Sequence, residues 1–95
     1  MRIPFPENYN FIRFEKSSTI NKKYDAYLRN KKTGKILRVS FGDNRYQQYK
    51  DRTGLGLYSH MDHKDAQRRK NYLTRHAGDK DFKYSSGWFS ARYLW

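Results

Sequence analysis

The sequence predicts a small α+β fold, in which a β-hairpin packs on one main helix, with short helical pieces and an extended aromatic N-terminal arm. Two patterns carry this prediction. Apolar and polar residues alternate on both sides of a glycine-containing turn, as they do in the strands of a hairpin. Further along, a polar segment with a thin apolar stripe follows an aspartate and ends at a glycine, as a capped helix does. The 95 residues make one domain at most, since domains usually hold about 100–150.

The predicted arm covers residues 1–22, and the single basic domain covers residues 23–95. The arm opens with two prolines among aromatic residues. Residues 11–14 have the composition of a short strand, and the polar run at 17–19 indicates a loop. We expect the first ten residues to lie on another surface; a floppy terminus is the alternative.

The hairpin is predicted to pair residues 23–28 with residues 36–41. Gly34 lies in the turn between them and can take the positive φ that a tight turn requires. The apolar positions of the two strands alternate along the chain: Tyr24, Ala26, Leu28, Leu37, Val39 and Phe41. The tip is either a solvated turn or a basic contact surface, because it carries three lysines: Lys31, Lys32 and Lys35.

Two helical segments are expected after the hairpin. Asp43 is a candidate cap for a short helical turn over residues 44–50. The main helix is expected from about residue 63 to residue 76, with Asp62 as its N-cap and Gly78 as its C-cap. Its polar face is expected to be a contact surface, since it carries four cations: Arg68, Arg69, Lys70 and Arg75.

The end of the chain is aromatic, with large apolar side chains at five of the last eight positions. Such a tail either closes the small core or docks on a neighbouring molecule. Four side chains are predicted as apolar anchors, one from the arm and three from the tail: Phe5, Trp88, Phe89 and Trp95.

The charge of the chain predicts an anionic partner. It holds 21 Lys and Arg against 9 Asp and Glu, a formal net charge of +12, which repels itself in a compact state. Nucleic acid and an acidic protein surface both fit this charge. The absence of cysteine excludes disulfides and thiolate metal sites. No apolar run approaches the ~20 residues of a membrane span.

Catalysis is not predicted, and neither is a cofactor, a metal ion or a small-molecule substrate. His60 and His63 are spaced as two ligands of one metal, with Asp62 between them. A hairpin followed by such a helix resembles the ββα-metal nucleases in outline. However, Asp62 is explained as a cap. His76 would lie ~20 Å from His63 along a continuous helix, so these two cannot share a site.

Tyrosines interleaved with cations are the remaining pattern in the middle of the chain. Aromatic side chains flanked by cations stack bases and neutralise phosphates. Tyrosine and arginine are equally enriched at protein–protein interfaces. The pattern therefore leaves both kinds of partner open. It comprises Tyr46, Tyr49, Tyr58 and Tyr72 with Arg45, Lys50, Arg52, Arg68 and Arg69.

Four blocks of residues 39–95 resemble a small uncharacterised family of basic proteins of large DNA viruses and phages. The blocks read SFGDxRYxxYKDxT, YSHxDH, RRxxYxxRH and YLW. The similarity covers roughly residues 23–95. It implies a viral origin and no established catalytic activity.

For a large icosahedral DNA virus, the resemblance implies a structural role. The expected function is that of a minor capsid (cement) protein on the inner face of the shell, bound to major and other minor capsid proteins. The expected location is the virion, after synthesis in the host cytoplasm or nucleus. The alternative is a nucleic-acid-binding protein that contacts viral DNA in genome packing or expression.

Overall fold

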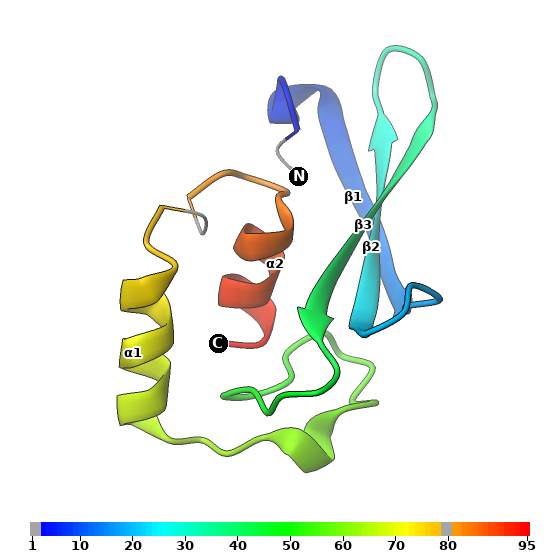
Figure 1. The fold of residues 1–95 in the computed structure, drawn as a ribbon. Coiled ribbons are helices and arrows are strands. Elements are labelled where there is room, and N and C mark those ends of the chain that lie inside the picture. Colours follow the sequence, from blue (N-terminus) through cyan, green and yellow to red (C-terminus); the bar gives the residue numbers. More distant parts are fainter. Residues whose placement is uncertain (1–2, 79–80) are drawn as a thin grey trace.

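The computed structural model describes residues 3–78 and 81–95. They form a three-stranded antiparallel sheet and two α-helices, with α2 (Ser86–Tyr93) drawn between the sheet and α1 (Ala66–Arg75) in Figure 1. The α+β fold class predicted from the sequence is confirmed. The helix that packs on the sheet is α2, the shorter one, which lies against β3 (Ile36–Asp43).

The predicted hairpin is confirmed and is longer than expected. β2 (Lys22–Asn30) pairs antiparallel with β3, and Tyr24 faces Phe41 across the pair. Gly34 in the connecting turn has φ +74°, as the turn requires. Because alternate side chains point to the same face, one face of the hairpin is apolar and supplies five buried residues: Tyr24, Ala26, Leu28, Val39 and Phe41.

Much of the predicted arm is an edge strand of the same sheet. β1 (Tyr9–Lys16) pairs antiparallel with β2, which makes β2 the central strand. The strand expected at residues 11–14 is therefore confirmed and extends further in both directions. A short 3₁₀ turn, η1 (Pro6–Asn8), precedes it, and Ile3 is buried in the core. Phe5 is 68% exposed.

The helical turn predicted over residues 44–50 does not form. Asp43 Oδ1 accepts a hydrogen bond from the Arg45 amide at 2.9 Å, which closes a turn and starts no helix. The chain then runs extended far enough for Gln48 to bridge to Asp62 in parallel orientation. The buried Gln48 side chain stabilises this extended conformation, because its amide group is hydrogen-bonded to Lys23 and to the Tyr58 carbonyl.

The main helix begins later than predicted, and its caps differ from those predicted. Asp65 caps α1, with Oδ1 accepting from the amides of Gln67 and Arg68 at 2.9 and 3.2 Å. Lys64, at φ +54°, cannot be a helical residue. The helix ends at Arg75, with His76 and not Gly78 as its C-cap. Asp62 is unavailable as a cap because its carboxylate accepts from Gln48 and Asp51.

The aromatic tail closes the core of the domain. Ser85 Oγ caps α2 by accepting from the Trp88 amide at 3.1 Å, and Ser86 Oγ donates to the Ser40 carbonyl of β3 at 2.8 Å. Phe89 is fully buried and stacks on Phe41, with ring centroids 5.3 Å apart. The expectation that the tail completes the core is therefore correct for this part of it.

Candidate functional site

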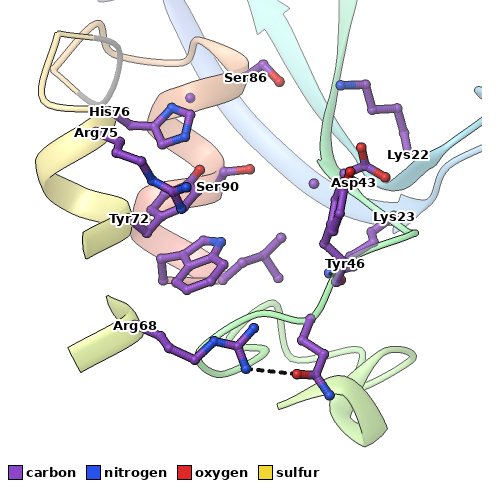
Figure 2. A pocket seen from close by; sticks show the side chains of 15 residues that line it. Lys22, Lys23, Asp43, Tyr46, Arg68, Tyr72, Arg75, His76, Ser86 and Ser90 are labelled. Carbon is purple, nitrogen blue, oxygen red and sulfur yellow. Dashed lines mark hydrogen bonds between the residues drawn. The ribbon is translucent and has the colours of Figure 1, made fainter. Parts of the chain in front are cut away.

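A cleft of about 840 Å³ opens between α1, α2 and the end of β3. Figure 2 shows four side chains of the α1 segment projecting towards it, with Lys22 and Tyr46 on the opposite side. The four are Arg68, Tyr72, Arg75 and His76. Residues from α2, including Ser86 and Ser90, complete the lining. The cleft therefore brings together segments that lie far apart in the sequence.

The lining of the cleft carries a net positive charge. Its lysine and arginine residues are Lys22, Lys23, Arg68 and Arg75, and Asp43 is its one acidic side chain. That carboxylate is already paired, because Arg45 donates to both of its oxygens at 3.0 and 2.8 Å. The hydrogen bonds from Arg45 lower the pKa of Asp43 to about 2. The side chains that line the cleft therefore offer an external anion more positive than negative charge.

Four aromatic rings, including that of His76, also line the cleft. Tyr72 stacks on Trp95, with ring centroids 4.2 Å apart and planes 4° from parallel. It also stacks on His76 at 4.3 Å, so the three rings form a column along one wall. Tyr46 belongs to the other wall and is 65% exposed. Cations and flat rings therefore occur on both sides of the opening.

The four helix cations predicted as one contact face are divided by the structure. Arg68 and Arg75 line the cleft, and Arg68 Nη1 donates to Gln47 Oε1 at 2.9 Å. Arg69 is used internally, since its Nε donates to the backbone oxygen of Trp95 at 2.8 Å. Lys70 is exposed and is not part of the cleft lining. Only part of the predicted face can therefore contact a ligand in the cleft.

The hairpin tip is a second basic surface, separate from the cleft. Its three predicted lysines are exposed, and Figure 1 places the tip at the end of the sheet away from α1. The tip is held by Asn30, whose Oδ1 accepts from the amides of Lys32 and Thr33 at 2.8 and 3.1 Å. These lysines, Lys31, Lys32 and Lys35, therefore offer a comparison for the cations of the cleft.

The four predicted apolar anchors have different surroundings. Phe89 lies inside the core of the domain and has no surface to offer a neighbour. Trp88 is half-buried, with the Arg92 guanidinium 4.6 Å from its ring centre. Trp95 stacks within the cleft. Phe5 alone of the four is largely exposed.

A buried polar network supports the wall that carries Tyr46. Lys23 is 1% exposed, and its Nζ donates to the Tyr46 carbonyl at 2.7 Å and to Gln48 Oε1. Gln48 Nε2 in turn donates to Asp62 Oδ1 at 2.6 Å and to the Tyr58 carbonyl at 2.7 Å. Burial lowers the pKa of Lys23 to about 8, although the nearby aspartates oppose this shift. The network holds the Tyr46 backbone and leaves its ring exposed.

A second part of the network anchors the loop that follows. Tyr24 donates its hydroxyl hydrogen to Asp51 and accepts from the Leu57 amide at 3.0 Å. Burial, with the hydrogen bond to Asp51, raises the pKa of Tyr24 to about 12. Burial alone would raise the pKa of Asp51, but hydrogen bonds from Tyr24, Thr53 and Tyr58 lower it. Both groups are therefore explained by structure and need no catalytic role.

The histidines singled out in the sequence do not assemble a metal site. Within residues 3–78 and 81–95, no group of three or more His, Cys, Asp or Glu side chains is placed to hold a metal ion. His63 Nδ1 accepts from the Asp65 amide at 2.9 Å. Burial, together with the charge of Arg68, lowers the pKa of His63. Asp62, between the two predicted ligands, is committed to Gln48 and Asp51.

Several cleft residues were not predicted as site residues. Lys22 and Lys23 are the first two residues of β2. In the sequence they are only two adjacent lysines before an alternating apolar pattern, which does not indicate a binding site. Tyr46 and Tyr72 were recognised as aromatic residues among cations, but nothing placed them on facing walls.

None of the helices in the described parts of the chain has the length and apolar composition needed to cross a membrane. Comparisons with protein-family models, curated proteins and solved structures found no match to the chain.

Proposed function

We propose that this protein binds nucleic acid through the cleft between α1, α2 and the end of β3. One observation carries the proposal: cations and exposed or half-buried rings line both sides of the cleft, and its one acidic side chain is already paired. Lys and Arg neutralise phosphates, and aromatic rings stack bases. Such a ligand would also offset the net charge of +12. In the virus that the sequence pattern suggests, the nucleic acid would be viral DNA or its transcripts.

A concave site fits this ligand better than it fits a folded acidic protein. A stable protein interface needs about 800 Å² from each partner and is usually built around a packed apolar centre. Here the charged and aromatic side chains converge on a hollow of about 840 Å³, a size typical of sites that enclose small or extended ligands. A polymer of phosphates and bases fits both its charge and its rings.

Removing cations of the cleft should weaken binding and reduce its salt dependence. The double variant Arg68→Gln/Arg75→Gln should bind a labelled oligonucleotide at least roughly 100-fold more weakly, since each of the two lost charge-assisted hydrogen bonds contributes about 1.5–3 kcal/mol. The slope of log Kd against log salt should fall by about 0.7–0.9 for each phosphate that the variant no longer neutralises. Fluorescence anisotropy from 50 to 200 mM NaCl measures both quantities.

The hairpin tip provides a control of equal charge. Lys31→Gln/Lys32→Gln removes the same two charges at a surface away from the cleft, and should change affinity much less. Circular dichroism checks that both double variants are folded. Equal losses of affinity in the two variants would mean that the cleft is not the site and that binding follows net charge alone.

A minor capsid role on the inner face of a virus shell stays a prediction, with major and other minor capsid proteins as partners. The exposed apolar side chains at Phe5, Ile20 and Ile36 would be available to such neighbours. A shell component should remain with the shell at a fixed ratio to the major capsid protein when virions are separated into shell and DNA. Quantitative mass spectrometry measures this ratio. Partition with the DNA fraction would contradict the shell role and agree with nucleic-acid binding.

A further inference from the structure

We infer that the ligand of the cleft is single-stranded nucleic acid, held by stacking of a base on Tyr46 as well as by phosphate contacts. This inference rests on the proposed function and specifies its ligand. Three features carry it: the size of the cleft, the direction of the α1 cations and the exposure of the Tyr46 ring.

The cleft is too small for a duplex and suits a short extended strand. Its volume of about 840 Å³ lies within the ~300–1,000 Å³ range of pockets that enclose drug-sized ligands. A duplex is usually recognised by a protein element that enters the groove of the DNA, and not by a protein cleft that encloses the DNA. Only separated strands present phosphates and unpaired bases to the inside of a hollow of this size.

Two cations of α1 reach the cleft. Arg68 and Arg75 line the cleft and also border a second hollow with Lys70, and Arg69 is bonded to the backbone oxygen of Trp95. Lys70, the remaining cation of the helix, does not line the cleft. A strand in the cleft can therefore place phosphates against Arg68 and Arg75, with Lys70 beside them.

The Tyr46 ring is the best placed stacking surface. It is 65% exposed and lines the cleft, opposite the α1 side chains in Figure 2. The Arg45 guanidinium lies 5.8 Å from its centre, and a cation beside a ring is common in single-strand sites. Lys23 bonds the Tyr46 carbonyl and not the ring, so the ring can be removed without breaking the buried network.

The test compares three probes with the 95-residue protein between 50 and 200 mM NaCl: a labelled ten-nucleotide oligothymidine, a duplex of ten G·C-rich base pairs, and an abasic strand of ten units. Oligothymidine should bind at least about tenfold more tightly than the duplex. Tyr46→Ala should weaken oligothymidine binding roughly 5- to 150-fold, the range for one missing base stack. It should leave the abasic strand and the salt slope nearly unchanged, because no charge is removed.

Two control variants isolate the stacking effect. Tyr46→Phe keeps the ring and should retain binding of oligothymidine. Phe5→Ala removes an equally exposed aromatic ring outside the cleft and should have no effect. Equal or tighter binding of the duplex, or an equal loss of affinity for the abasic strand in Tyr46→Ala, would overturn the single-strand inference and leave the proposed function standing. Failure to bind any of the three probes would overturn both.

Discussion

Phe89→Ala should destabilise the protein by about 3–5 kcal/mol, the usual cost of replacing a buried phenylalanine with alanine. Phe89 is 0% exposed and lies among six other rings. It stacks on Phe41 and on Tyr84, and meets Phe14 and Trp88 edge-on. Deleting it leaves a cavity where α2 meets the sheet. Since small domains have only about 5–15 kcal/mol in total, the variant should lose a large fraction of its stability.

Urea unfolding followed by circular dichroism measures this cost, with Phe5→Ala as the matched control. Phe5 is exposed, so its removal should change the free energy of unfolding by less than about 0.5 kcal/mol. A cost below about 1 kcal/mol for Phe89→Ala would contradict the packing of α2 on the sheet, because overpacked or loosely packed sites are the ones that tolerate such deletions.

Gly42→Ala should cost roughly 2–5 kcal/mol, the sum of about 1–2 for a left-handed alanine and about 1–3 for overpacking. Gly42 has φ +76°, and a Cβ there would lie 2.7 Å from Leu94 Cδ1 and 3.3 Å from Lys23 Cβ. Both neighbours are buried, which limits how far they can move. The strain would fall at the floor of the cleft, since all three residues line it.

Gly54→Ala separates the two contributions. Gly54 has φ +86° but no atom within 4 Å of a Cβ, so its replacement should carry only the backbone cost of about 1–2 kcal/mol. Urea unfolding of both variants measures the difference. In the double variant Gly42→Ala/Leu94→Ala, part of the clash should be relieved, giving a favourable coupling energy in a double-mutant cycle. Equal costs for the two glycines would show that the clash does not exist.

Local patterns were sufficient for the hairpin. Strand pairing between neighbouring segments depends on alternation and on a turn residue, and both signals lie within residues 22–43. The positive φ at Gly34 and the buried positions Tyr24 and Phe41 follow from the same short stretch. Prediction from sequence is strongest where the interactions are local.

The start of α1 could not be predicted from local pattern, because two aspartates fit the role of cap. Asp62 and Asp65 both precede the helix, and the choice is made by Gln48 and Asp51, which bond the Asp62 carboxylate from 14 and 11 residues away. The same long-range burial of Gln48 prevents the helix expected at residues 44–50. A propensity is overruled here by the need to satisfy a buried polar group.

The cleft was out of reach of sequence reasoning for a similar reason. Its cations and rings come from the start of β2, the segment after β3, α1 and the end of the chain. The sequence around Arg69 and Arg75 does not distinguish their roles. In the structure, Arg69 donates to the backbone oxygen of Trp95, whereas Arg75 lines the cleft. Only the packing of α1 near Trp95 decides which cation faces the opening.

The order of elements along the chain means that the sheet is synthesised well before the helix that covers it. The sheet is complete once residue 43 has been made, but α2, which covers its apolar face, begins only at residue 86. At a ribosomal rate of about 5–20 residues per second, the two events are separated by roughly 2–9 seconds. Throughout that interval the face bearing Tyr24 and Phe41 has no helix over it. The nascent chain therefore passes through a stage in which the apolar face of the sheet is exposed to solvent and to other chains. That stage ends when α2 has been synthesised and packs on the sheet.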